Sequence, residues 1–172
     1  MPVLFVFGNS GSGKSTLAKR LSLECSLAHL DLDTLAWQPG MPPVRREISA
    51  SIAELNDFLD GNADCVIEGC YADLFTAIAF RCTKMIFLDP GVDACVTNAR
   101  ARPWEPHKYP SKEAQDANLA MLIGWIRDYE TRTDEFSRAA HHRLFDGFVG
   151  DKVRLTTRDA IRTFTMATGL EQ

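Results

Sequence analysis

Several features that would place a sequence in a class at once are missing from this chain. No apolar run is long enough to span a bilayer, and the first one, at 3–7, follows no basic residues and leads into glycines rather than a cleavage site. The five cysteines are odd in number and include no C-x-x-C pair, which favours reduced, buried thiols. We therefore expect no signal peptide, no membrane span and a cytoplasmic location.

An excess of positive charge is also missing. Nineteen lysines and arginines stand against twenty-three aspartates and glutamates, which gives a net charge of -4. This balance argues against direct binding to nucleic acid and against binding to the surface of an anionic membrane. Any anion that the protein binds must therefore be met by locally concentrated positive charge.

What is present is the pattern of an α/β protein. The 172 residues are 45% hydrophobic and 24% charged, as in one folded domain that needs neither disulfides nor a structural metal. Apolar, β-prone runs predict strands at 3–7, 28–32, 65–67, 85–88 and 153–155. Helical patterns lie at 14–25, 48–61, 92–102, 111–132 and 136–145, with Ser111 as an N-cap, and a last helix is capped by Thr157 and closed by Gly169. The alternation predicts a single domain, 1–172, with a parallel sheet covered by helices on both faces.

The strongest motif follows the first predicted strand. It matches G-x-x-x-x-G-K-[ST] and opens a helix, and its residues are Gly8, Asn9, Ser10, Gly11, Ser12, Gly13, Lys14, Ser15 and Thr16. Such a loop turns its amides toward phosphate oxygens, so we expect Lys14 to reach the β- and γ-phosphates of ATP and Ser15 to ligate Mg²⁺. A dinucleotide fingerprint would need a third glycine where Thr16 stands. A glycine-rich turn without a ligand would not require the Lys14-Ser15 pair.

Acidic residues stand at the ends of the second, third and fourth predicted strands. Because ligands of such sheets bind beyond the carboxyl ends of the strands, these acids should border the same crevice as the loop. We assign Glu68 and Asp31 to the magnesium ion, Glu68 through second-shell or water contacts, and Asp33 to the orientation of a phosphoryl acceptor, with Asp31 as the alternative. Capping of the next turn is an equally open role for Asp31 and Asp33, and the favoured one for Asp89 before Pro90-Gly91.

A basic, proline-rich segment predicts a lid at 100–112. It carries Arg100, Arg102, His107, Lys108 and Lys112 in an otherwise acidic chain. Closing over a triphosphate, its Arg100 and Arg102 would neutralise charge in the transition state. The alternative is that these basic residues form a solvated face at a helix end and bind no phosphate.

Aromatic residues and histidines give weaker signals. Trp37 and Tyr71 are candidates to line an acceptor pocket by stacking, although core packing is as good an account of Trp37. Trp125 and Tyr129 are expected to pack in the core. The other histidines, His29, His141 and His142, have no metal-ligand spacing with the cysteines and are taken as structural or surface residues.

The sequence resembles the small P-loop kinases of the adenylate kinase and shikimate kinase type, and within them the bacterial topology-modulation-like, adenylate-kinase-related ATPases. The resemblance rests on four segments: 8–16, His29-Leu30-Asp31-Leu32-Asp33 with Trp37-Gln38-Pro39-Gly40, Val66-Ile67-Glu68-Gly69-Cys70-Tyr71, and Phe87-Leu88-Asp89 followed by Arg100 and Arg102. It implies a five-stranded sheet in the order 2-3-1-4-5, a lid with phosphate-binding arginines, ATP with Mg²⁺, and an adenine pocket near Thr156-Thr157-Arg158.

Departures from the pattern of these kinases leave the acceptor unassigned. In nucleoside monophosphate kinases the third strand ends in Asp-Gly followed by a phenylalanine and an arginine, whereas this chain has Glu68-Gly69-Cys70-Tyr71. The missing arginine argues against a nucleotide acceptor. Shikimate kinases share an Asp-x-Asp like Asp31-x-Asp33, but they carry a glycine triplet where this chain has Glu68-Gly69-Cys70, which argues against shikimate.

The sequence thus predicts an enzyme that binds a nucleoside triphosphate and a small-molecule acceptor. It would transfer the γ-phosphoryl group of ATP, with Mg²⁺, to an unidentified hydroxyl or phosphate acceptor. Two alternatives stay open: a nucleotide-dependent regulatory or interaction module, and simple ATP hydrolysis. The preference for ATP over GTP and the oligomeric state are not encoded in any pattern that we recognise.

Overall fold

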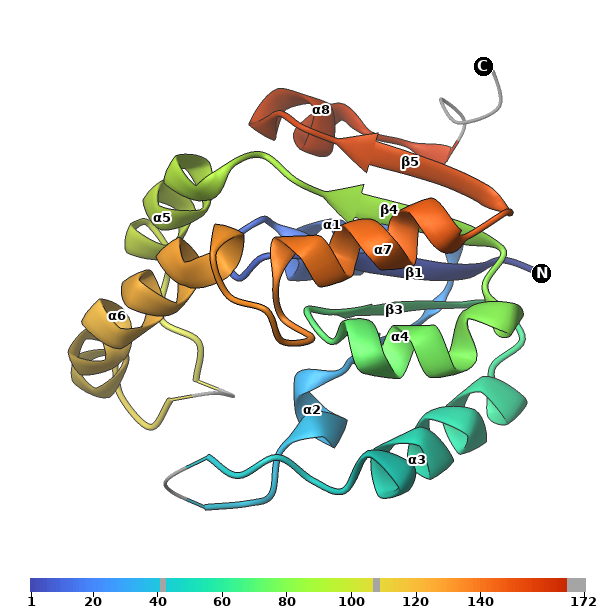
Figure 1. Cartoon of the computed structure of the whole chain (residues 1–172), viewed down its shortest axis with the longest axis horizontal. Coiled ribbons are helices and arrows are strands. Elements are labelled where there is room, and N and C mark those ends of the chain that lie inside the picture. Colours follow the sequence, from blue (N-terminus) through green and yellow to red (C-terminus); the bar gives the residue numbers. More distant parts are fainter. Residues whose placement is uncertain (41–42, 107–108, 167–172) are drawn as a thin grey trace.

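A parallel β-sheet forms the centre of the molecule (Figure 1). The computed structural model describes residues 1–40, 43–106 and 109–166. Its five strands are β1 (Val3–Gly8), β2 (Ala28–Asp31), β3 (Cys65–Gly69), β4 (Lys84–Leu88) and β5 (Asp151–Leu155). They pair in the order β2-β3-β1-β4-β5, and every pairing is parallel. The predicted fold class and strand order are confirmed.

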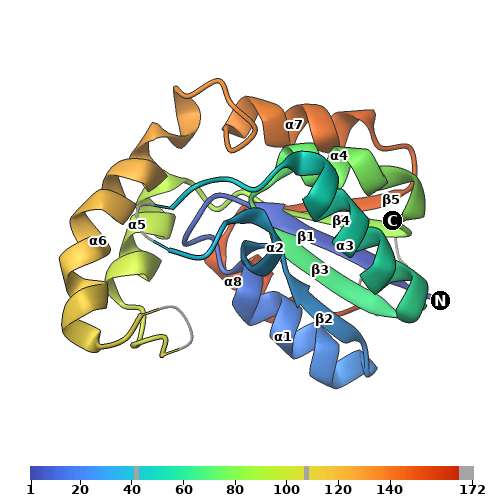
Figure 2. The same ribbon diagram turned by 90° about the horizontal axis from the view of Figure 1, so that it is seen from below.

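The sheet is covered on both faces, as Figure 2 shows. Helices α1 (Lys14–Cys25) and α8 (Arg158–Thr163) pack on the face that carries Leu4 and Val6. On the other face, which carries Phe5 and Phe7, lie α3 (Ile48–Gly61), α4 (Ala72–Ile78) and α7 (Arg138–Gly147). Because both faces of β1 are buried, the strand is a continuous apolar run rather than an alternating one.

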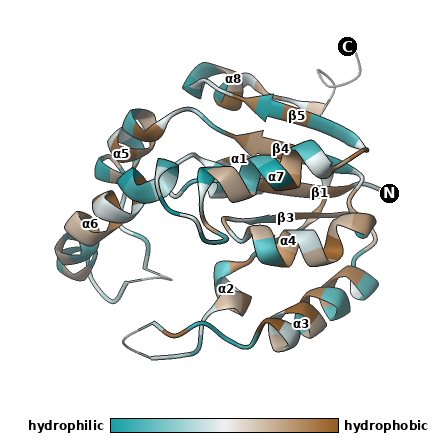
Figure 3. Ribbon diagram, in the orientation of Figure 1, coloured by the Kyte–Doolittle hydropathy of each residue, from teal (hydrophilic) through white to brown (hydrophobic). Residues whose placement is uncertain are grey.

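The edge strand β5 differs from the central strands. Every residue of β4 is buried, whereas only Leu155 of β5 is. Figure 3 shows the contrast as a brown β4 beside a largely teal β5. A hydrophilic edge strand is expected, because an apolar one would invite pairing with another chain.

A helical hairpin stands beyond the carboxyl ends of the strands. It is formed by α5 (Val92–Arg100) and α6 (Lys112–Arg127), and it is seen at the left of Figure 1. The two helices share a small core of their own around Cys95, Val96 and Ile126. The predicted lid, 100–112, spans the segment that links them.

Helix boundaries are where the sequence-based prediction is least accurate. Ser111 caps α6 as predicted, accepting a hydrogen bond from the amide of Ala114, but the helix ends at Arg127 rather than near 132. A 3₁₀ turn, η2 (Asp128–Glu130), follows and buries Tyr129. Helix α5 ends at Arg100, two residues before the predicted end.

Some elements were not predicted. Helices α4 and α2 (Asp33–Ala36) and the 3₁₀ turn η1 (Ala79–Arg81) had no counterpart in the sequence-based prediction. Helix α8 ends at Thr163, and Gly169, the predicted end, lies outside the described residues. All five cysteines are free. In the described part of the chain, no helix combines the length and the hydropathy needed to cross a membrane.

Candidate functional site

A cleft of about 1190 Å³ opens at the carboxyl ends of the strands. Its walls come from the loop after β1, from the ends of β2 and β3, from the segment after α5 and from the start of α8. A second groove, of about 840 Å³, lies between α4 and α7 and contains none of the predicted site residues. We therefore place the candidate site in the first cleft.

The loop after β1 adopts backbone angles that suit glycine. Gly11 has a φ of 76° and Gly13 a φ of 100°, both in the left-handed region that side chains disfavour. A Cβ atom on Gly11 would also lie 2.4 Å from the carbonyl oxygen of Cys95 in α5. The loop can take this shape only because glycine stands at these positions, and it delivers the chain to the first turn of α1 at Lys14.

The predicted phosphate-binding residues are brought together by this geometry. The cleft is lined by every residue from Ser10 to Thr16, while Gly8 ends β1 and Asn9 is buried behind the loop. Lys14 bends back over the loop, and its ammonium group donates to the carbonyl of Asn9 at 2.8 Å. The Ser12 hydroxyl is buried and forms no hydrogen bond with any residue that the structure describes. An N-terminal helix end, a lysine and an unsatisfied hydroxyl together fit the polyphosphate tail of a nucleotide.

Two asparagines tie the loop to the α5–α6 hairpin. The side-chain amide of Asn98 in α5 donates to the carbonyl of Gly11 at 2.8 Å, and that of Asn9 donates to the carbonyl of Ile126 in α6 at 3.0 Å. The role of Asn98 was not predicted, because its partner lies 87 positions away and no local pattern marks it.

Positive charge is concentrated around the cleft, as the composition requires of an anion site. Besides Lys14, the cleft is lined by Lys19, Arg20, Arg102, Arg158 and Arg162. Arg102 forms an ion pair with Glu105 at 3.2 Å. Arg100, predicted beside it, is exposed on the last turn of α5 and does not line the cleft. The assigned role of Arg102 is thus compatible with its position, whereas Arg100 stands apart from the site.

The two acids at the end of β2 and the start of α2, Asp31 and Asp33, line the cleft near the loop. An oxygen of Asp31, Oδ1, accepts a hydrogen bond from the amide of Asp33 at 2.9 Å, so Asp31 also shapes the turn into α2. Asp33 is the first residue of α2, and its Oδ1 accepts a hydrogen bond from the Tyr71 hydroxyl at 2.6 Å. The capping role left open for Asp31 therefore exists beside its place in the cleft.

Glu68 is a buried acid at the cleft floor. It is 2% exposed, and β-sheet pairing places it beside Asp31. Its Oε1 has no hydrogen-bond partner among the described residues and lies 3.8 Å from Nε2 of His29. The described residues hold no cluster of three or more His, Cys, Asp or Glu side chains suited to a metal ion. A hydrated Mg²⁺ fits such a site, because it takes one or two protein carboxylates and completes its shell with water and phosphate oxygens.

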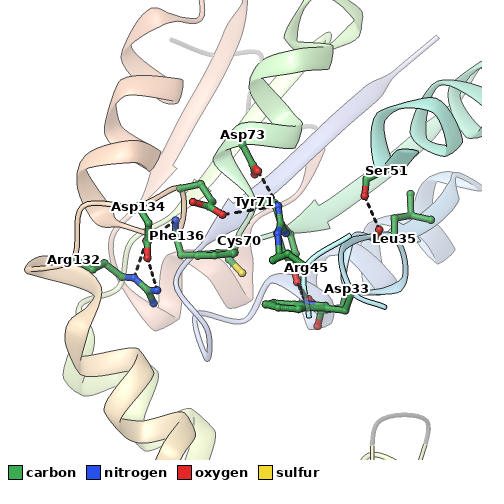
Figure 4. Close-up of polar contacts among 12 residues, drawn as sticks. Asp33, Leu35, Arg45, Ser51, Cys70, Tyr71, Asp73, Arg132, Asp134 and Phe136 are labelled. Atoms are coloured by element: carbon green, nitrogen blue, oxygen red, sulfur yellow. Dashed lines mark hydrogen bonds and ion pairs between the residues drawn. The ribbon is translucent and has the colours of Figure 1, made fainter. Parts of the chain in front are cut away.

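Tyr71 and Trp37 do not line the cleft by stacking. Tyr71 is 1% exposed and belongs to the core under the cleft floor, and Trp37 packs against the same core. The indole Nε1 of Trp37 donates to the Tyr71 oxygen at 2.6 Å. Burial raises the pKa of Tyr71 above its ordinary value, and the Asp33 carboxylate adds to this shift. Figure 4 shows Tyr71 between Asp33 and Arg45.

The prediction that Asp89 caps the following helix is wrong. Gly91 occupies the N-cap of α5, and no side chain caps that helix. The carboxylate of Asp89 is buried and accepts hydrogen bonds from Arg138 at 2.9 Å and from Arg154 at 3.1 Å. Burial alone would raise its pKa, but the two arginines outweigh this effect and lower it. Asp89 thus fastens α7 and β5 to the end of β4.

The predictions for Tyr129, Trp125 and His141 are confirmed. Tyr129 is buried, and Trp125 packs against the core. His141 is fully buried and contacts the Tyr129 hydroxyl and the carbonyl of Cys70, a structural role. Burial lowers the pKa of His141 to about 4.

The segment at the predicted lid is anchored to α6 at several points. The amide of Glu105 donates to the Gln115 side chain at 2.8 Å, and Asn118 donates to the Tyr109 hydroxyl at 2.9 Å. Trp104 and Tyr109 line the cleft. At the start of α6, Lys112 pairs with Asp116. His107 and Lys108 lie outside the described residues.

The region near the predicted adenine pocket begins α8. Thr157 caps the helix by accepting a hydrogen bond from the amide of Ala160, and Arg158 lines the cleft. This places the start of α8 on the cleft wall, at the end of β5.

Comparison with known proteins identifies the fold but no family. No protein-family model and no curated protein matches the sequence. A sugar kinase from Janibacter sp. HTCC2649 has 16% identity and a TM-score of 0.52 over 99% of this chain and 91% of its own. A shikimate kinase from Aquifex aeolicus has 16% identity and a TM-score of 0.51 over 98% and 96%. A gluconokinase from Sinorhizobium meliloti 1021 has 15% identity and a TM-score of 0.54 over 94% and 85%.

The chain therefore has the fold that these three solved kinases share, a parallel sheet covered by helices on both faces. At these levels of identity, the likeness establishes the architecture, and the activity must be argued from the site.

Proposed function

We propose that this protein is a P-loop kinase that transfers the γ-phosphoryl group of ATP, with Mg²⁺, to a small-molecule acceptor. One observation carries the proposal: the glycine loop with Lys14 shares a single cleft with the strand-end acids Asp31, Asp33 and Glu68. Phosphoryl transfer needs just these two parts, a cradle for the polyphosphate and acidic groups that place the metal ion and the acceptor.

The nucleotide would be held by the phosphate loop. Backbone amides at the start of α1 and the ammonium group of Lys14 would face the phosphate oxygens, and the unsatisfied Ser12 hydroxyl offers one more donor. Arg102 stands on the cleft wall, where its charge would compensate the charge on the phosphates. Arg158 at the start of α8 would lie nearer the base.

Mg²⁺ would be held by Ser15, by Asp31 and by Glu68 through water. It would supply charge neutralisation on the β- and γ-phosphates. The orphaned Oε1 of Glu68 supports this assignment, because a buried carboxylate oxygen without a partner is costly unless a ligand satisfies it.

Asp33 would orient the acceptor. It lines the cleft at the start of α2, where its carboxylate can accept a hydrogen bond from a hydroxyl group of the acceptor. The sugar, gluconate and shikimate kinases that share the fold suggest polyhydroxylated acceptors as the first class to try.

The proposal is tested by incubating the purified protein with Mg²⁺ and γ-labelled ATP and a panel of sugars, sugar acids, shikimate and nucleoside monophosphates. We expect label on one acceptor class. Lys14→Ala should lower transfer by at least about 100-fold with an unchanged circular dichroism spectrum. Arg81→Ala, which removes a cation paired with Asp60 outside the cleft, is the matched control and should retain wild-type transfer.

Label that appears only as inorganic phosphate, at a rate that no panel member changes, would contradict the kinase and favour simple hydrolysis. Nucleotide binding without either product would favour the regulatory module.

A further inference from the structure

The hydrogen bonds between Trp37, Tyr71 and Asp33 have only one possible direction. An indole nitrogen can only donate, so the Tyr71 oxygen must accept from Trp37 at 2.6 Å. The single proton of the hydroxyl is then given to Oδ1 of Asp33, also at 2.6 Å. Burial keeps this proton in place, because it raises the pKa of Tyr71. Tyr71 is thus a permanent donor to one chosen oxygen of Asp33.

The ring that carries this hydroxyl is fixed on several sides. Phe136 meets it edge to face, with ring centroids 5.4 Å apart, and Trp37 meets it in the same manner at 6.5 Å. The guanidinium group of Arg45 lies 4.8 Å from the ring centre and is itself held by Asp73 at 2.8 Å. The hydroxyl therefore cannot swing away from Asp33 without disturbing the core (Figure 4).

The contact joins two elements that end side by side at the cleft. Asp33 begins α2 just after β2, and Tyr71 follows the end of β3. A backbone hydrogen bond from Asp33 to Oδ1 of Asp31 fixes the same turn. Asp33 lines the cleft, and the Tyr71 hydroxyl holds its Oδ1 atom. This hydrogen bond restricts rotation of the Asp33 carboxylate.

We propose that Tyr71 is a positioning residue for phosphoryl transfer, which holds the Asp33 carboxylate in the orientation that receives the acceptor. This inference rests on the proposed function, because it assigns Asp33 to the acceptor. Tyr71 touches neither substrate. It acts through Asp33, and its removal should slow the transfer step rather than weaken nucleotide binding.

Tyr71→Phe is the direct test, because it removes the hydroxyl and keeps the ring that packs on Phe136 and Arg45. The matched control is Tyr129→Phe. Tyr129 is similarly buried and does not contact Asp33. Its variant loses one hydrogen bond, to His141 at 2.7 Å, whereas Tyr71→Phe loses two. Tyr71→Phe should lose more thermal stability than Tyr129→Phe, because it breaks two hydrogen bonds rather than one. Should Tyr71→Phe fail to fold, Trp37→Phe tests the same row of hydrogen bonds, because it removes the donor that orients the Tyr71 hydroxyl.

The assay measures phosphate release from Mg-ATP with water as the acceptor, alongside transfer to any acceptor found in the panel. We expect Tyr71→Phe to lower kcat about 10-fold in both reactions, with KM for ATP within 2-fold of wild type. Trp37→Phe should lower kcat about 3-fold. Tyr129→Phe should keep both constants within 2-fold. Asp33→Asn should lower kcat about 100-fold, and adding Tyr71→Phe to it should cause no further loss.

The outcomes separate this inference from the kinase proposal. A Tyr71→Phe enzyme as fast as Tyr129→Phe, or one whose loss adds fully to that of Asp33→Asn, overturns the positioning role even if an acceptor is found. If no panel member is phosphorylated but hydrolysis shows the expected pattern, the kinase proposal fails and the positioning role stands. A wild-type protein that neither hydrolyses ATP nor transfers phosphate overturns both.

Discussion

Replacement of Gly11 by alanine should damage both the fold and the site. The residue has a φ of 76°, and its added Cβ would lie 2.4 Å from the Cys95 carbonyl oxygen, a backbone atom that cannot simply turn aside. The left-handed backbone costs a residue with a Cβ about 1–2 kcal/mol. Overpacking against a fixed neighbour adds about 1–3 kcal/mol. The free energy of unfolding should therefore fall by about 2–5 kcal/mol.

Two further glycines separate the two parts of this cost. Gly40 has a φ of 119° but nothing within 4 Å of an added Cβ, so Gly40→Ala should cost only the backbone share, about 1–2 kcal/mol. Gly124 is an exposed helical residue in α6 with open space around its Cβ position. Gly124→Ala should stabilise the protein by about 0.5–1 kcal/mol, because alanine is the better helix former.

The assay is urea denaturation followed by tryptophan fluorescence, together with calorimetry of Mg-ATP binding. Because 1 kcal/mol shifts the melting temperature of a chain of this size by about 2–4 °C, Gly11→Ala should melt about 4–20 °C lower. It should also bind Mg-ATP more weakly than Gly40→Ala does. If Gly11→Ala is no less stable than Gly40→Ala, the contact with α5 is not rigid and the reasoning is wrong.

Two buried ionisable groups predict how stability depends on pH. Asp89 has a lowered pKa, so it stabilises the fold above about pH 4 and loses this effect as the pH falls through its folded-state pKa. Asp89→Asn should cost about 1–3 kcal/mol at pH 7 in urea denaturation, and a cost that stays constant down to pH 2.5 would contradict the ion-pair account. His141 has a pKa near 4 when folded, so the unfolded chain takes up its proton first as the pH falls from about 6.5. The wild type should lose stability between these values, His141→Gln should show a flatter profile there, and parallel profiles would refute the assignment.

The parts of the molecule that the sequence predicts well are those that depend on neighbours along the chain. The apolar runs of the strands and the motif from Gly8 to Thr16 are local patterns, and they predict the strands of the sheet and the position of the phosphate loop. The N-cap at Ser111 is equally local, since its partner is Ala114.

What the sequence does not predict depends on contacts between distant residues. The bond from Tyr71 to Asp33 spans 38 positions, and those from Arg138 and Arg154 to Asp89 span 49 and 65. An aspartate before a proline and a glycine has the pattern of a helix cap. Only the folded chain shows that the Asp89 carboxylate instead accepts hydrogen bonds from Arg138 and Arg154. The prediction of helix boundaries is wrong at α6, which ends at Arg127 and is followed by the 3₁₀ turn that buries Tyr129.

The two asparagine bonds behind the phosphate loop bear on how the protein is made. The loop is synthesised within the first sixteen residues, yet its anchors are Asn98 and the carbonyl of Ile126. A nascent chain that has not yet released residue 126 from the ribosome therefore lacks half of the scaffold that shapes its own motif. Competence to bind nucleotide should therefore arise only after residue 126 has emerged, and not when the motif itself does.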